Sequence, residues 1–63
     1  MVWKVTYNNY RDAQSARYSE MFSGHLANMV LHDRILYFES NLKYKDLTIV
    51  VNGYGHVDCI ELM

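Results

Sequence analysis

The chain has 63 residues, enough for one small domain (1–63), and 51% of them are hydrophobic. Its single cysteine excludes an intramolecular disulfide, and no Cys/His spacing of the zinc type is present, so association with another chain is the remaining source of extra stability. A net charge of −1 without any basic run disfavours a dedicated nucleic-acid binder.

The first element is a strand over residues 2–7, "VWKVTY", which is rich in β-branched and aromatic residues. It alternates, with Trp3, Val5 and Tyr7 on one side. The following "NNYRDAQ" contains Asn and Asp, whose short side chains bond the local backbone in turns, so we expect the chain to reverse there.

The next segment has two interpretations. In one, a helix runs over residues 12–31, with Tyr18, Phe22, Leu26 and Met29 as its apolar stripe, and Gly24 weakens it from within. In the other, residues 16–22 form a second strand, Ser23 caps a helix, and that helix covers 24–42. We favour the second because it explains the glycine and gives the first strand a neighbour.

On the predicted helix 24–42, Asp33 falls within the apolar arc and would need a partner if it were buried. His25, His32 and Glu39 recur every seven residues, about 10.5 Å of helix rise, which is too far for one metal ion to bridge. We therefore interpret that stripe as a solvated face and expect no metal site.

The last two predicted strands cover 47–51 ("LTIVV") and 56–62 ("HVDCIEL"), joined by the three-residue loop 53–55. This register places Cys59 in the core and puts His56 and Asp58 together on the opposite face, where they can touch. We favour this structural interpretation over a catalytic or metal site, since a buried cysteine is poorly reactive.

The predicted fold is α+β, a small antiparallel sheet with one helix packed on one face, in the order ββαββ. One helix leaves apolar side chains uncovered on the other sheet face and on the back of the helix, and exposed apolar patches mark interaction surfaces. The predicted partner-binding residues are Val50, His56, Asp58, Ile60 and Leu62 on the outer sheet face, and Leu31, Ile35 and Phe38 on the outer helix face.

These observations predict a non-enzymatic protein-binding module, an adaptor or inhibitor that occupies a partner's surface and forms a homodimer. Accessory or phage-encoded regulators of host enzymes have this size, an analogy from size and fold alone. Six tyrosines offer rigid contact area with a polar tip. No catalytic motif is present, and we expect no cofactor.

The alternative is a small nucleic-acid-binding protein that uses its sheet face, with Lys4, Arg11, Arg17, Lys43 and Lys45 as phosphate contacts. A small enzyme using His56 and Asp58 ranks last. No stretch has the apolar length of a membrane span, and "MVWKVTYNN" lacks the features of a signal peptide. We therefore expect a complete small gene product that is cytoplasmic.

Overall fold

The computed structural model describes residues 1–63 and contains four strands and two helices. In chain order they are β1 (Val2–Tyr7), α1 (Tyr10–Ser23), β2 (Ala27–His32), β3 (Ile35–Glu39), α2 (Tyr44–Asn52) and β4 (Val57–Leu62).

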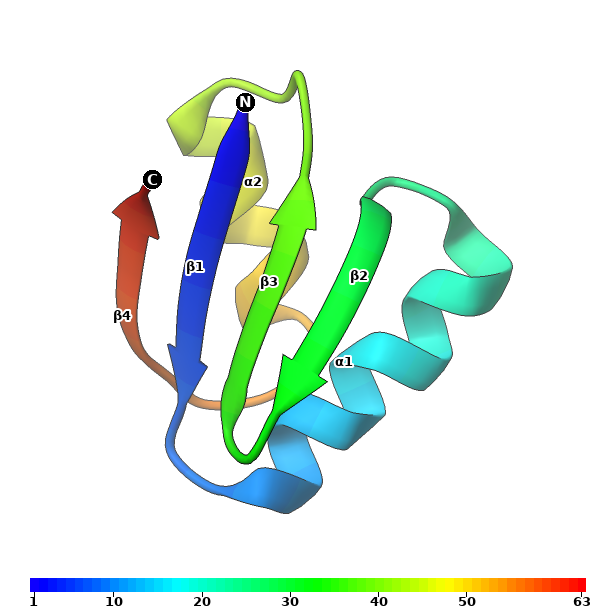
Figure 1. Ribbon diagram of the computed structural model, residues 1–63, viewed down its shortest axis with the longest axis vertical. Helices are drawn as coiled ribbons and strands as arrows, with labels where there is room; N and C mark the ends of the chain where they lie inside the picture. Colours follow the sequence, from blue (N-terminus) through cyan, green and yellow to red (C-terminus); the bar gives the residue numbers. More distant parts are fainter.

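The strands form one antiparallel sheet in the order β2-β3-β1-β4, and both helices lie on the same face of it (Figure 1). This order is the connectivity of the split β-α-β, or ferredoxin-like, arrangement. The predicted α+β class with a small antiparallel sheet is confirmed. The order ββαββ and the single helix are wrong, because both helices stand where the sequence suggested strands and two strands stand where it suggested the helix.

Strand β1 lies at the centre of the sheet and was predicted with its observed boundaries. Trp3, Val5 and Tyr7 are all buried, as their alternation predicted, and they point toward the helices. Leu36 and Phe38 of β3 join them in a core of ten buried residues, on which Val57 and Ile60 of β4 also pack. The core therefore lies between the sheet and the two helices.

Helix α1 covers the segment for which we expected a strand over 16–22, and both interpretations of Gly24 are wrong. The helix begins at the Asn9 cap, whose side-chain oxygen accepts a hydrogen bond from the Asp12 backbone N–H at 2.9 Å. It ends at Gly24, which has φ +73° and donates its N–H to the Glu20 carbonyl at 2.9 Å. The glycine is thus a left-handed C-cap, which only residues without a Cβ adopt freely.

The hairpin β2–β3 occupies most of the predicted helix 24–42. Asp33 takes φ +58° in the tight turn between these strands, so it is an exposed turn residue and does not lie in an apolar arc. Asp tolerates this conformation because its short side chain bonds local backbone. The predicted helix was wrong because the apolar residues at 36 and 38 follow a period of two.

Helix α2 replaces the predicted strand 47–51, and residues 53–55 connect it to β4 instead of closing a hairpin. Leu47 and Val51, four residues apart, are both fully buried against the sheet. Packing of this pair outweighs the β-propensity of "LTIVV", which is a weak preference that tertiary context overrides.

Strand β4 was predicted correctly as a strand, but it pairs with β1 and its facing differs from the expectation. Thr6 lies opposite Cys59 and Tyr7 lies opposite Val57, so Asp58 is an extra residue in a β-bulge. The bulge puts Val57 and Cys59 on opposite faces although they are two residues apart. Cys59 is therefore exposed, and its predicted place in the core is wrong.

The loop between α2 and β4 passes so close to α1 that Gly55 has no room for a side chain. A Cβ there would lie 2.6 Å from the Asp12 Cβ. We expect Gly55→Ala to push α1 and this loop apart and to lower the free energy of unfolding by about 1–3 kcal/mol, measured by urea denaturation. Gly53→Ala is the control, because Gly53 is helical and its nearest neighbour would lie at 3.3 Å. An equal loss in both variants would contradict the close approach at Gly55.

Candidate functional site

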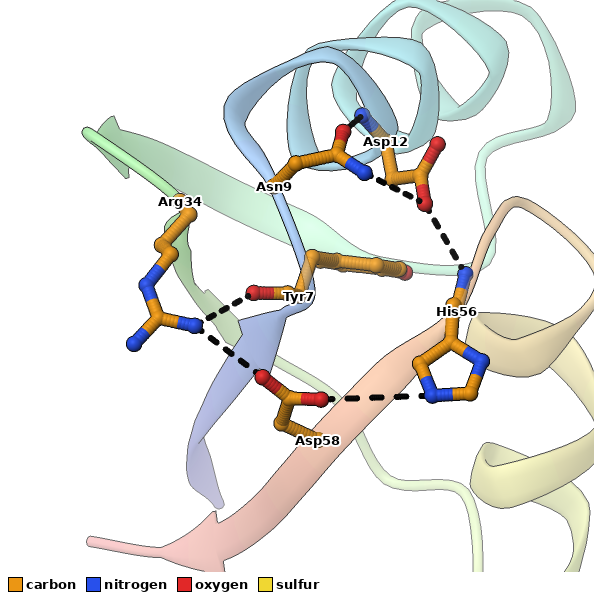
Figure 2. Close-up of polar contacts among 6 residues, drawn as sticks. All are labelled: Tyr7, Asn9, Asp12, Arg34, His56 and Asp58. Atoms are coloured by element: carbon orange, nitrogen blue, oxygen red, sulfur yellow. Dashed lines mark hydrogen bonds and ion pairs between the residues drawn. The ribbon is translucent and has the colours of Figure 1, made fainter.

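Two of the predicted site residues, His56 and Asp58, belong to a polar cluster at one end of the sheet, shown in Figure 2. The cluster joins the end of β1, the start of α1, the β2–β3 turn and the start of β4. Its six members are Tyr7, Asn9, Asp12, Arg34, His56 and Asp58.

Arg34 is the centre of this cluster, since one guanidinium nitrogen serves two partners. Its Nη1 donates to the Tyr7 carbonyl at 3.2 Å and to the Asp58 carboxylate at 3.0 Å. The other Asp58 oxygen lies 4.0 Å from His56 Nε2, so the predicted proximity of that pair is present at ion-pair distance. Both members of the Arg34–Asp58 pair are partly exposed, and such pairs contribute about 0–1 kcal/mol.

The same cluster ties the α2–β4 loop to the start of α1. Asp12 Oδ2 accepts the His56 backbone N–H at 3.1 Å, while the Asp12 N–H donates to the Asn9 cap. The six residues include no serine, threonine or cysteine, and the Tyr7 hydroxyl is turned to the Val51 carbonyl at 2.8 Å. The arrangement therefore holds four segments in place and presents no nucleophile to the His56 ring.

The exposed Cys59 follows Asp58 and lies opposite Thr6, on the open face of the sheet. Its thiol lies 3.4 Å from Glu61 Oε1, and this hydrogen bond raises the pKa of Cys59. A raised pKa keeps the sulfur protonated at neutral pH, and a thiol is a weaker nucleophile than a thiolate.

Burial raises the pKa of the Tyr7 phenol, since a phenolate would lose its hydration inside the core. The neutral form is thus favoured in the folded state, and its contribution to stability is complete below the ordinary tyrosine pKa of about 10. That contribution is lost as the pH rises above 10 toward the higher folded pKa.

We expect Tyr7→Phe to cost about 1 kcal/mol at pH 7, because it removes the hydrogen bond to Val51. Above pH 10, the stability of the wild type should fall more steeply with pH than that of the variant, by up to about 1.4 kcal/mol per pH unit. Urea denaturation at pH 7, 10 and 11 measures both effects. Tyr18→Phe, which alters an exposed side chain, is the control, and parallel curves for wild type and Tyr7→Phe would contradict the expectation.

A second polar group, Glu20, is fully buried at the last turn of α1. Its carboxylate accepts the Leu26 backbone N–H at 2.7 Å and the Tyr54 hydroxyl, and His25 Nδ1 lies 3.2 Å away. Burial and then the bond to Glu20 raise the pKa of Tyr54. Glu20 thereby connects α1 to the segment that enters β2 and to the α2–β4 loop.

Helix α1 is turned with its small and acidic side chains inward. Its buried residues are Ala13, Ala16 and Glu20, whereas Phe22 is 90% exposed, Met21 65% and Tyr18 58%. The α1 outer surface, as we define it, consists of Tyr10, Arg11, Arg17, Tyr18, Met21 and Phe22. Sequence reasoning missed this surface, because the favoured interpretation made residues 16–22 a strand and the helical alternative turned Tyr18 and Phe22 inward.

The predicted partner-binding residues do not form the two patches expected from the sequence. Val50 belongs to α2, and Leu31, Ile35 and Phe38 belong to strands, so no outer helix face contains them. Phe38 is 1% exposed and cannot meet a partner. Ile60 packs against the core while Leu62 is exposed, and both follow Val5 and Trp3 in register instead of lying on the open sheet face. The two expected patches depended on helix and strand assignments that the structure does not have, and partner binding by the exposed residues among them stays a prediction.

Two hollows mark the surface. The larger, about 490 Å³, lies where β2 begins and β3 ends, and its Asn28 and Glu39 side chains bond each other. The smaller, about 260 Å³, lies between α1 and β2. No three His, Cys, Asp or Glu side chains gather closely enough to hold a metal ion. Neither helix has the length and apolar character needed to cross a bilayer.

Comparisons with protein-family models, with curated proteins and with solved structures found no match to this chain. No relative therefore indicates which residues act, and only the geometry of this chain bears on its function. The polar cluster and Glu20 connect segments of the chain to one another. The α1 outer surface, in contrast, leaves large apolar side chains exposed to solvent.

Proposed function

We propose that the protein is a non-enzymatic protein-binding module, an adaptor or inhibitor, and that the α1 outer surface is its docking surface. The observation that supports this most is the orientation of α1, which places alanines and a glutamate inward and three aromatics and a methionine outward. Protein interfaces are enriched in aromatic residues, methionine and arginine, and this surface combines all three kinds.

The energetics favour the same interpretation. Covering a large apolar side chain such as Phe22 removes it from water and stabilises a complex by about 1.5–3 kcal/mol. Aromatic and arginine side chains also dominate the residues that contribute most to binding at interfaces. A partner that covers Phe22, Met21 and Tyr18 together therefore gains affinity from a few neighbouring residues.

The test is an affinity purification from the cells that make the protein, with quantitative mass spectrometry. We expect one partner protein in about equal amount with the wild type and with Ile49→Glu, and its loss with Phe22→Glu. Ile49 is the matched control, because it is an exposed apolar residue on the other helix, 66% exposed against 90% for Phe22. Equal recovery with both variants would contradict this docking surface.

Self-association stays a prediction, and light scattering at micromolar concentration tests it. A measured mass of one chain would exclude the homodimer. Nucleic-acid binding by the sheet face has less support. On that face Lys4 lies opposite Glu61 on one side and Tyr37 on the other, so its charge has an acidic neighbour. A gel shift that weakens as the salt concentration rises would support nucleic-acid binding.

A further inference from the structure

The hollow of about 260 Å³ is a groove between α1 and the outer strand β2. Its residues from α1 are about one helical turn apart and so form one stripe, which Leu31 of β2 faces from the other wall. They are Gln14, Arg17, Tyr18 and Met21. The volume falls below the range of about 300–1,000 Å³ typical of small-molecule sites. A single apolar side chain of a peptide is the better match in size.

Beside this groove lies β2, the edge strand of the sheet, which is paired on one side only. Strand β2 pairs with β3 alone, so alternate backbone N–H and C=O groups of β2 point outward. Regular pairing with β3 covers Val30, Leu31 and His32, whereas the register shifts between Ala27 and Val30, where Asn28 has φ +52°. In Figure 1, no strand lies on the outer side of β2, and α1 lies behind the sheet and extends beyond this edge.

The charge at the groove has one sign. Arg17 lines it, and Arg11 is also exposed on the outward side of α1. The two acidic residues of this helix are engaged elsewhere, since Asp12 bonds Asn9 and His56 and Glu20 is buried. Arg17 is therefore the one charged side chain that lines the groove, and neither acidic residue of its helix pairs with it. An arginine at a groove favours a carboxylate as its partner.

We propose that an extended, acidic segment of a partner protein adds as a strand to the free edge of β2, inserts an apolar side chain into the groove and places a carboxylate on Arg17. Backbone hydrogen bonds to the edge strand supply affinity in this mode of recognition, and the groove supplies specificity. This inference rests on the proposed function and specifies the chemistry of the partner.

A second copy of the chain fits this edge less well. A two-fold contact through β2 would bring Arg17 and Arg11 of one protomer near those of its partner. Like charges brought together weaken association. An acidic peptide meets no such repulsion.

The test is selection of 12-residue random peptides displayed on phage, against the purified full chain, followed by fluorescence anisotropy with the synthetic peptides. We expect the selected peptides to combine acidic with alternating apolar residues. Arg17→Glu should weaken binding about tenfold or more, whereas Lys45→Glu, the same charge change at an exposed position on α2, should leave it unchanged. Backbone amides of residues 29–32 should exchange their hydrogens more slowly when the peptide is bound. Circular dichroism of each variant confirms folding.

Three outcomes would overturn the inference. Selection of no peptide, or of peptides whose binding ignores Arg17→Glu, excludes an acidic segment. Peptides that bind without slowing exchange in β2 exclude strand addition. A dimer that Arg17→Glu strengthens or weakens would make a second copy the occupant. The proposed function fails separately, when Phe22→Glu and Ile49→Glu recover a partner equally.

Discussion

Replacing Phe38 by alanine is expected to lower the free energy of unfolding by about 3–5 kcal/mol, a large part of the total. Phe38 lies in the core between the sheet and the helices and is 1% exposed. Truncating a buried phenylalanine costs about 3–5 kcal/mol, from lost burial and from the cavity left behind. Since stability is on the order of 0.05–0.15 kcal/mol per residue, a 63-residue chain has roughly 3–9 kcal/mol in total. The single substitution thus removes a large part of it.

The matched control for this prediction is Phe22→Ala, which removes the same atoms from a side chain that is 90% exposed. We expect a change within about 0.5 kcal/mol there, because nothing is packed on that ring. Far-UV circular dichroism and urea denaturation of both variants decide the matter. If Phe22→Ala proved the more damaging, the orientation of α1 and the docking surface built on it would both be wrong.

The strands at the two ends of the chain, β1 and β4, were predicted from their sequence patterns. Strand β1 alternates strictly and has no competing helical pattern, so Trp3, Val5 and Tyr7 could be placed in the core from sequence. Strand β4 was recognised from the same kind of signal. Its facing was not, because the bulge at Asp58 changes the alternation, and nothing in the sequence marks an extra residue in a strand pair.

In the middle of the chain, the favoured prediction made both helices strands, for different reasons. In α1 the favoured interpretation was a strand over 16–22, and the helical alternative turned Tyr18 and Phe22 inward, although both face solvent. In α2 the β-branched run resembles a strand, and only burial of Leu47 and Val51 reveals the helix. One usable signal was present: Asn9 precedes a segment with small residues at 13 and 16, which suits a capped helix close to a sheet.

The candidate sites were likewise predictable only in part from the sequence. The proximity of His56 and Asp58 was predicted from a spacing of two along one strand, although His56 precedes β4 and Asp58 lies in its bulge. Arg34 reaches Asp58 from a turn whose position depends on the whole topology. The docking surface could not be predicted, because it requires knowing that α1 buries Glu20. A sequence offers no sign that a glutamate will face inward, since an unpaired buried charge is costly and its partner Tyr54 lies 34 residues along the chain.

Replacing Glu20 by alanine is therefore the second change expected to have a large effect. The substitution leaves the buried Leu26 N–H and the part-buried Tyr54 hydroxyl without their carboxylate acceptor, and a hydrogen bond to a carboxylate contributes about 1.5–3 kcal/mol. We expect a loss of about 3 kcal/mol or more in urea denaturation, a large fraction of the total. The last turn of α1, which carries Met21 and Phe22, should lose its fixed position relative to β2.

Two further variants separate the role of the carboxylate from simple packing. Glu20→Gln keeps the shape and one acceptor oxygen for Leu26, so its loss should be intermediate, and the pKa of Tyr54, followed by NMR, should fall toward its ordinary value. His25→Ala removes the partner that is half exposed and should cost no more than about 0.5 kcal/mol. Equal losses in Glu20→Ala and His25→Ala would show that the carboxylate is not what holds α1. The inward glutamate would then no longer explain why the aromatic residues of this helix face outward.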